Sequence, residues 1–118
     1  MLQPGPAKKL IIYVDESDKH KSRPVHEVVV ELLFTNKVAG ASVFRGMAGY
    51  GSHGHFHTSK LLELSTDLPV KIEVVDSAES IENVLPLLSA IIAKGIIEVS
   101  DTVVIKCARP STFDSNKK

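Results

Sequence analysis

Several features that are common in proteins are missing from this sequence. It contains no tryptophan and a single cysteine, Cys107, so no disulfide can form within the chain, and a reducing compartment is the simplest interpretation. No apolar run approaches the ~20 residues that a membrane-spanning helix needs. The first residues, 1–6, lack the apolar core of a signal peptide. We therefore expect a cytoplasmic protein with an aliphatic core of valine, isoleucine and leucine.

An excess of charge of either sign is also missing. The 14 basic residues balance the 14 acidic ones, so the formal net charge is zero. Nonspecific nucleic-acid binding usually relies on a basic excess or stripe, and nucleic acid is therefore not an expected partner. A neutral surface also gives little repulsion between copies of the chain, so self-association is not opposed. The length of 118 residues fits one domain with a hydrophobic core.

Apolar patterns predict two β-α-β units joined by a glycine-rich segment. Asp76 and Glu79 have the spacing of a capping box before the second helix. Pro86 conflicts with that helix, which would either kink there or begin its regular part near Asn83. The expected elements are strands at 9–14, 41–47, 70–75 and within 96–107 (most clearly 102–106), helices from Pro24 to about Asn36 and through 81–92, and a helical turn at 61–64.

This order of elements predicts a fold class. Two β-α-β units with right-handed crossovers give an α+β, ferredoxin-like βαββαβ fold, in which a four-stranded antiparallel sheet carries both helices on one face. The first strand is apolar on both sides, because Ile11 and Tyr13 alternate with Leu10 and Ile12. An open sheet should have a polar second face. We therefore expect the second face to be buried against other copies of the chain.

A glycine- and histidine-rich segment, residues 45–58, lies between the two units. It holds four of the seven glycines and three of the five histidines. Dense glycine lets a ligand approach main-chain N–H groups closely, so this segment is the candidate functional centre. Residues 49–54 match the pattern G-x-G-x-x-G of dinucleotide-binding folds. That fold is not expected, because no helix start follows the motif, a β-α unit precedes it, and the chain is too short for two mononucleotide-binding halves.

The histidines of this segment, His53, His55 and His57, alternate along the chain. In an extended segment they would point the same way and could bind Zn²⁺, Ni²⁺ or Cu²⁺. No cysteine or carboxylate joins them locally, which favours solvent-exposed or subunit-contacting histidines over a metal site. The nearby Ser65–Asp67 is not accompanied by a nucleophile elbow or an oxyanion-hole pattern, so enzymatic activity is not expected.

Four short motifs identify a family resemblance. They are residues 40–46 (Gly-Ala-Ser-Val-Phe-Arg-Gly), Gly49-Tyr50-Gly51, His57-Thr58 and 64–70 (Leu-Ser-Thr-Asp-Leu-Pro-Val). With these motifs the chain resembles the PII signalling proteins and, more closely, an uncharacterised prokaryotic family of PII-like proteins. The resemblance covers residues 8–108, which we expect to form one PII-like domain. Residues 1–7 are then a flexible lead-in, and residues 109–118 are a flexible tail.

The resemblance implies a PII-like homotrimer whose sheets line a central core. It implies that an adenine nucleotide, ADP or ATP with or without Mg²⁺, binds in clefts between subunits. A loop at about residues 50–65 would sense the ligand and contact a partner such as a membrane transporter or a metabolic enzyme. The nucleotide-binding residues implied in this way are Arg45, Gly46, Gly49, Tyr50, Gly51, Ser52, Lys71, Lys106 and Arg109.

The sequence departs from the PII pattern in two places. The second glycine-rich loop of PII proteins, which holds phosphates, corresponds to a stretch with a single glycine, Gly95. The arginine and glutamine that usually follow the loop-base glycines are replaced by Ser52 and His53. These departures imply altered nucleotide binding. They also leave open two alternatives on the same fold: a metal-binding or metal-tolerance protein that uses the three loop histidines, and a small enzyme that uses the cleft.

Overall fold

The computed structural model describes residues 2–49, 57–58 and 67–107. The predicted helical turn at 61–64 lies outside these residues. The described elements are β1 (Gly5–Asp15), β2 (Lys19–His20), β3 (Arg23–Pro24), α1 (Val25–Thr35), β4 (Ser42–Arg45), β5 (Ala48–Gly49), β6 (His57–Thr58), β7 (Pro69–Asp76), α2 (Ala78–Ile91) and β8 (Ile96–Val104).

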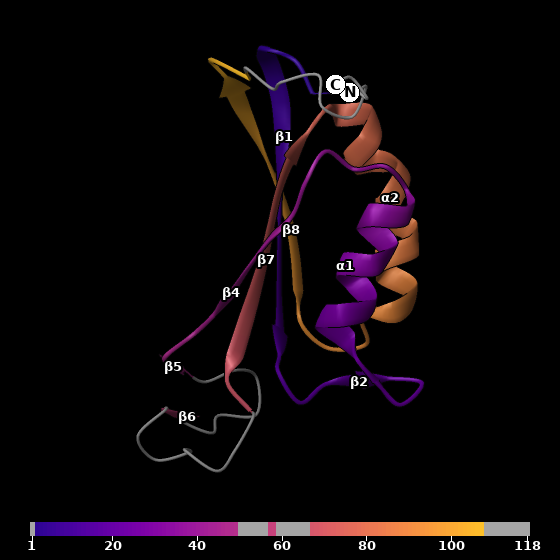
Figure 1. Cartoon of the computed structure of the whole chain (residues 1–118), viewed down its shortest axis with the longest axis vertical. Coiled ribbons are helices and arrows are strands. Elements are labelled where there is room, and N and C mark those ends of the chain that lie inside the picture. Colours follow the sequence, from indigo (N-terminus) through magenta and orange to yellow (C-terminus); the bar gives the residue numbers. More distant parts are fainter. Residues whose placement is uncertain (1, 50–56, 59–66, 108–118) are drawn as a thin grey trace, which may run out of the picture.

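The sheet is four-stranded and antiparallel, with the strand order β4-β7-β1-β8. Both helices pack on one of its faces, and the other face has no helix on it (Figure 1). The two central strands, β1 and β7, pair from Lys8–Asp76 to Asp15–Pro69. The arrangement confirms the α+β, ferredoxin-like fold that the order of elements predicted.

The core lies between the sheet and the two helices and is entirely aliphatic. Alternate residues of β1 and β7 face the helices, as expected for the two-residue period of a strand. Each helix contributes one stripe of residues three or four positions apart. The core side chains are Leu10, Ile12 and Val14 of β1, Val70, Ile72 and Val74 of β7, Val25, Val29 and Leu33 of α1, and Ile81, Val84 and Leu88 of α2.

The start of α2 differs from the predicted capping box of Asp76 and Glu79. Ser77 is the N-cap, and its Oγ accepts a hydrogen bond from the Ser80 N–H at 3.2 Å. Asp76 is the last residue of β7 and is buried. Its carboxylate accepts the N–H groups of Ala39 at 2.8 Å and Ser77 at 2.7 Å. The predicted box is therefore wrong, because the Asp76 carboxylate connects β7 to the segment between α1 and β4.

Pro86 does not interrupt α2, which runs from Ala78 to Ile91 with this proline inside it. The alternative in which the regular helix begins near Asn83 is wrong. Pro86 lies on the exposed side of the helix. The buried stripe on the opposite side continues past it from Val84 to Leu88, so tertiary packing maintains the helix across the proline.

Strand pairing moves several predicted strand ends. β1 begins at Gly5 rather than Lys9, because residues 5–7 pair with residues 102–104 of β8. β8 begins at Ile96 and ends at Val104, so the predicted strand at 102–106 is only its last part. The predicted loop at 15–23 contains the short β2–β3 hairpin. These ends depend on pairing partners that the local pattern does not show.

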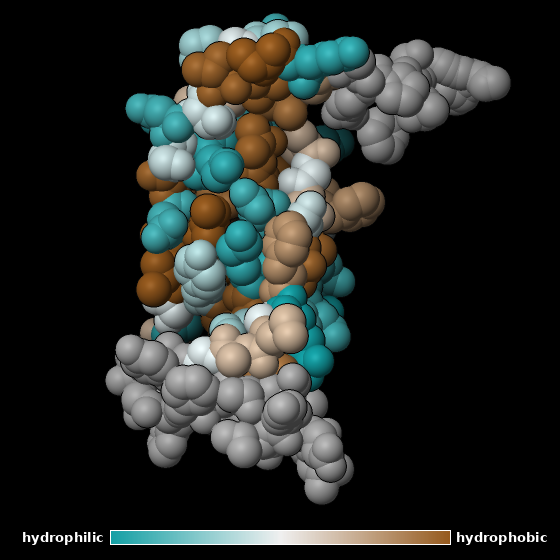
Figure 2. All heavy atoms as spheres, turned by 90° about the vertical axis from the view of Figure 1, so that its left-hand side faces the viewer, coloured by the Kyte–Doolittle hydropathy of each residue, from teal (hydrophilic) through white to brown (hydrophobic). Residues whose placement is uncertain are grey.

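The sheet face opposite the helices is mixed in character. Ile11 is half-buried and Tyr13 is 38% exposed. Charged side chains lie among them, with Glu73 accepting ion pairs from Lys9 at 3.5 Å and Lys71 at 3.8 Å. Figure 2 shows apolar and polar side chains interleaved on this side of the molecule. Within the part of the chain that the structure describes, no helix is long and apolar enough to cross a membrane.

Candidate functional site at the loop stems

The glycine-rich segment leaves the sheet at the end of β4 and returns to it at the start of β7. Its first part is paired, because Ala48 lies opposite Thr58 and Gly49 lies opposite His57 in the β5–β6 ladder. We call residues 45–49 the outgoing stem and residues 67–69 the returning stem. Both stems lie at the lower end of the sheet in Figure 1, next to the turn that follows β1.

Two glycines of the segment are required for close packing of the stems. The Gly46 N–H donates to the Pro69 carbonyl at 2.7 Å. A Cβ atom on Gly46 would lie 2.7 Å from Pro69 Cγ, and one on Gly49 would lie 3.2 Å from the same atom. The ring of Pro69 cannot move aside as a flexible side chain would. The absence of a side chain at position 46 therefore lets the two stems meet.

The turn after β1 contacts both stems. The Glu16 N–H donates to the Leu68 carbonyl at 2.8 Å, and the Ser17 hydroxyl donates to Asp67 Oδ1 at 2.6 Å. The Glu16 carboxylate accepts Arg45 Nε–H with both oxygens, at 3.0 and 2.9 Å. We call Glu16–Asp18 the clasp turn, because it bonds to the returning stem and, through the Glu16 carboxylate, to the outgoing stem.

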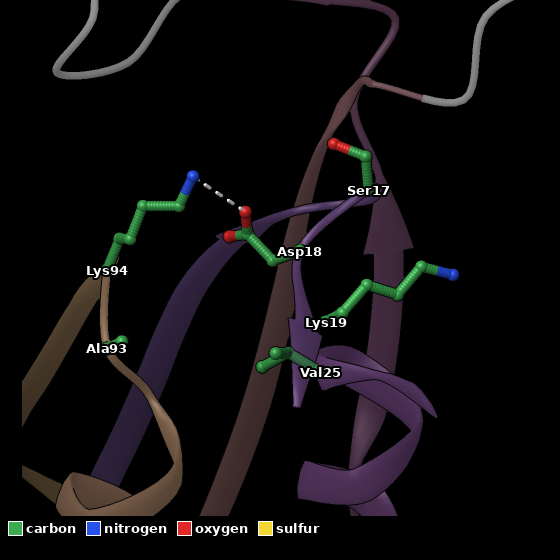
Figure 3. Close-up of a pocket in the computed structure, with 6 residues that line it drawn as sticks. All are labelled: Ser17, Asp18, Lys19, Val25, Ala93 and Lys94. Carbon is green, nitrogen blue, oxygen red and sulfur yellow. Dashed lines mark ion pairs between the residues drawn. The ribbon is translucent and has the colours of Figure 1, made fainter. Parts of the chain in front are cut away.

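A cavity of about 270 Å³ lies on the other side of the clasp turn. Asp18 Oδ1 pairs with Lys94 Nζ at 3.2 Å across it, and Asp18 Oδ2 accepts the Asp15 N–H at 3.0 Å. Figure 3 shows Asp18 and Lys94 pointing toward each other, whereas Lys19 points away from the pair. The cavity therefore connects the clasp turn to the turn between α2 and β8. Its lining residues are Ser17, Asp18, Lys19, Val25, Ala93 and Lys94.

Two of the predicted phosphate-binding cations lie at this end but on opposite faces of the sheet. Arg45 pairs with Val70, which is buried beneath the helices. Lys71 pairs with Phe44 on the other face, where its Nζ lies 4.9 Å from the Phe44 ring centroid and 3.8 Å from Glu73 Oε1. Paired residues of an antiparallel ladder share a face. Arg45, rather than Lys71, is therefore the cation that contacts the clasp turn.

Lys106 lies at the far end of the sheet. In the β1–β8 ladder, Tyr13 pairs with Ile96 at the loop-stem end, and Gly5 pairs with Val104 at the other. These eight steps along a strand correspond to about 26 Å, and Lys106 lies beyond Val104. Lys106 and Arg45 of one chain therefore cannot hold the same phosphate.

Other predicted site residues lie outside the described residues: Tyr50, Gly51, Ser52, His53, His55 and Arg109, together with the side chain of His57. The nucleotide and metal roles of these residues stay predictions. Among residues 2–49 and 67–107, no three histidine, cysteine, aspartate or glutamate side chains come together as metal ligands.

Sequence reasoning missed the clasp turn. Glu16, Ser17 and Asp18 were interpreted only as a polar loop, and Lys94 was not considered. One signal could have found them: in an antiparallel sheet, the end of the strand at 9–14 lies beside the start of the strand at 70–75. The acidic run after the first strand is therefore placed next to the returning stem.

Comparison with solved structures defines the class of fold. CPII, a nitrogen regulatory PII-like protein from Thiomonas intermedia K12 in a structure bound to ADP, AMP and bicarbonate, superposes with a TM-score of 0.61 at 24% identity, covering 90% of this chain and 94% of that one. A chain from Thermus thermophilus described as a putative PII-like signaling protein gives 0.63 at 17% identity, covering 88% and 94%. The chain has the PII-like fold.

The sequence also assigns the family. The model of the family DUF190, described as "Uncharacterized ACR", matches residues 7–104, and the chain belongs to this family. It is 38% identical over 101 residues to a UPF0166 protein of Methanocaldococcus jannaschii, which covers 85% of this chain and 93% of that protein. It is 32% identical over 99 residues to a UPF0166 protein of Aquifex aeolicus, covering 83% and 93%. The resemblance to an uncharacterised prokaryotic PII-like family is confirmed.

Proposed function

We propose that the protein is a PII-like regulatory protein, not an enzyme, that binds an adenine nucleotide, ADP or ATP, in clefts between the subunits of a homotrimer. One observation carries this proposal. Arg45 and the glycine-rich stems meet at one end of a sheet whose fold is shared with a PII-like protein solved with ADP and AMP.

The described residues suggest how the phosphates would be held. An arginine presents N–H donors in a planar fork that matches phosphate geometry, and Arg45 lies at the stem with 53% of its side chain exposed. The main-chain N–H groups of residues 49–51 would add donors without charge. The Gly46 N–H already donates to Pro69, so we assign Gly46 a packing role.

A cleft between subunits fits two further observations. The sheet face without helices carries Ile11 and Tyr13, which other copies would cover. Lys106 lies too far along the sheet to reach the stems of its own chain, so any contribution from Lys106 comes from a neighbouring copy. Ligand binding at the stems would order the loop at about residues 50–65 and change its affinity for a partner, such as a transporter or a metabolic enzyme.

Calorimetry tests this proposal on protein whose trimeric state has been confirmed by light scattering. The panel contains AMP, ADP, ATP and cyclic nucleotides, with and without Mg²⁺, and Zn²⁺ and Ni²⁺ alone. We expect ADP or ATP to bind. Arg45→Gln should weaken binding by about 10-fold or more, since a hydrogen bond to a charged group contributes ~1.5–3 kcal/mol.

Arg23→Gln is the matched control, because Arg23 also pairs with a glutamate, Glu31, at 2.8 Å. Its affinity should stay within about twofold of the parent. No heat with any nucleotide would contradict the proposal. Heat with Zn²⁺ alone, lost when His53, His55 and His57 are changed to alanine, would favour the metal-binding alternative.

A further inference from the structure

We propose that Glu16 makes the loop-stem site selective for ligands of low negative charge. Its carboxylate is a fixed anion placed against Arg45, and it penalises a bound nucleotide in proportion to the charge that the nucleotide carries. The inference rests on the proposed function, because it concerns the same site and the same class of ligand.

The position of this carboxylate is set by the fold. The Glu16 main chain is bonded to the returning stem through the Leu68 carbonyl at 2.8 Å, and Ser17 next to it is bonded to Asp67 at 2.6 Å. Only 20% of the Glu16 side chain is exposed, whereas 53% of the Arg45 side chain is. Glu16 is therefore held in place, and the more exposed Arg45 is the partner that a ligand can reach.

The charges at this point oppose a polyanion. Glu16 accepts Arg45 Nε–H with both oxygens, so the pair has no net charge. A phosphate that binds the remaining N–H groups of the arginine gains hydrogen bonds but comes within a few ångströms of the carboxylate. In the same turn, Asp18 is paired with Lys94 at 3.2 Å, so Lys94 is already engaged by a carboxylate. Each further negative charge on the ligand then adds repulsion from Glu16.

The expected effect depends on ligand charge. At about 6 Å in a water-like dielectric, one unit charge changes affinity by about threefold, and by more where the site is partly buried. Glu16→Gln keeps a side-chain oxygen that can accept Arg45 Nε–H but removes the charge. We therefore expect Glu16→Gln to tighten ATP more than ADP and ADP more than AMP, by about threefold or more for each added unit of charge.

Calorimetry with AMP, ADP and ATP tests the inference on four proteins: the parent, Glu16→Gln, Glu16→Asp and Glu31→Gln. Glu31→Gln is the matched control, because it also removes the glutamate from an exposed Arg–Glu pair, that with Arg23. Glu16→Asp keeps the charge and should keep the parent's ranking of nucleotides. The gain in Glu16→Gln should shrink between about 0.02 M and about 0.5 M NaCl, because salt screens the repulsion.

The outcomes separate this inference from the proposed function. If the parent binds nucleotides and Glu16→Gln weakens them all equally, or leaves their ranking unchanged, the inference is wrong and the proposed function stands. If no nucleotide binds to the parent, to Glu16→Gln or to Glu31→Gln, both are wrong. A gain that is the same in Glu31→Gln would reflect overall charge and would also overturn the role of Glu16.

Discussion

Arg45 at the end of β4 and Glu16 just after β1 form an ion pair at 2.9 Å, although their strands are not neighbours in the sheet. β7 lies between these strands, so the arginine side chain reaches across it. The pair therefore connects the strand that enters the glycine-rich segment to the central strand. This contact joins the candidate site to the clasp turn.

Gly46→Ala should destabilise the protein. The new Cβ would lie 2.7 Å from Pro69 Cγ and 3.3 Å from the Pro69 carbonyl oxygen, so the stems must move apart. Overpacking of this kind costs about 1–3 kcal/mol. Urea unfolding measures the change, with Gly40→Ala as the control, because no atom lies within 4 Å of a Cβ at that position. Equal stabilities of the two variants would contradict the close contact of the stems.

Leu88→Ala should remove a side chain from the centre of the core. Leu88 is fully buried, and such truncations cost about 2–5 kcal/mol because a cavity remains. The adjacent Leu87 is 43% exposed, so Leu87→Ala should cost about 0.5 kcal/mol or less. Thermal unfolding of both variants compares the two faces of α2. A larger loss for Leu87→Ala would mean that another molecule covers the outer face of the helix.

Asp76→Asn should destabilise the protein more than a surface substitution does. The carboxylate accepts N–H groups from Ala39 and Ser77 with separate oxygens, and asparagine has only one oxygen to offer. A buried donor left without a partner costs about 1–3 kcal/mol. Asp101→Asn, at an exposed residue, is the control in chemical denaturation. The role given to Asp76 would be wrong if both variants lost the same free energy of unfolding.

Ile11→Lys should dissociate the proposed trimer. Ile11 lies on the sheet face without helices and pairs with Glu73 on one side and Glu98 on the other, so a lysine there is compatible with the folded chain. It would place a new charge from every subunit in the trimer core. Size-exclusion chromatography with light scattering should find a monomer. Phe34→Lys changes an apolar residue of α1 that is 83% exposed, and this variant should stay trimeric.

The exposed pair of Lys8 and Asp101 should titrate abnormally. The hydrogen bond from Lys8 and its positive charge lower the pKa of Asp101 below its usual value of 3.8. Because the folded-state pKa is depressed, the pair's contribution to stability is present above the unfolded pKa and is lost as pH falls through the folded one. Carboxyl chemical shifts measured by NMR should show the lowered pKa, and Lys8→Gln should restore the usual value. An unchanged titration in Lys8→Gln would contradict the assignment.

Sequence patterns predicted the parts of the structure that depend on neighbouring residues. The two-residue alternation of 70–75 and the helical spacing in α1 and α2 are local, and they identified the faces that the core buries. The start of β1 at Gly5 depends on pairing with Val104, which no local pattern reveals. The capping box failed because Asp76 has a partner, Ala39, that is 37 residues away.

The candidate site was predictable only in part for the same reason. The glycines of the stems were identified as important, but the sequence does not show that Gly46 is needed because of Pro69. Glu16 was overlooked because its importance comes from Arg45, which lies on a different strand. Side-chain contacts between elements follow from topology and register, and neither is visible in a single segment of the chain.

The clasp turn also has a consequence for the order of folding. Its contacts connect residues 29 positions apart in the pair with Arg45 and 50 positions apart in the bond to Asp67, and the pair with Lys94 spans still more of the chain. Contacts between such distant residues form late, since the entropy of closing the intervening chain must be lost first. During synthesis the turn emerges early, but its last partner follows only when most of the chain has been made. A ligand site at the stems is therefore complete only in a nearly finished chain.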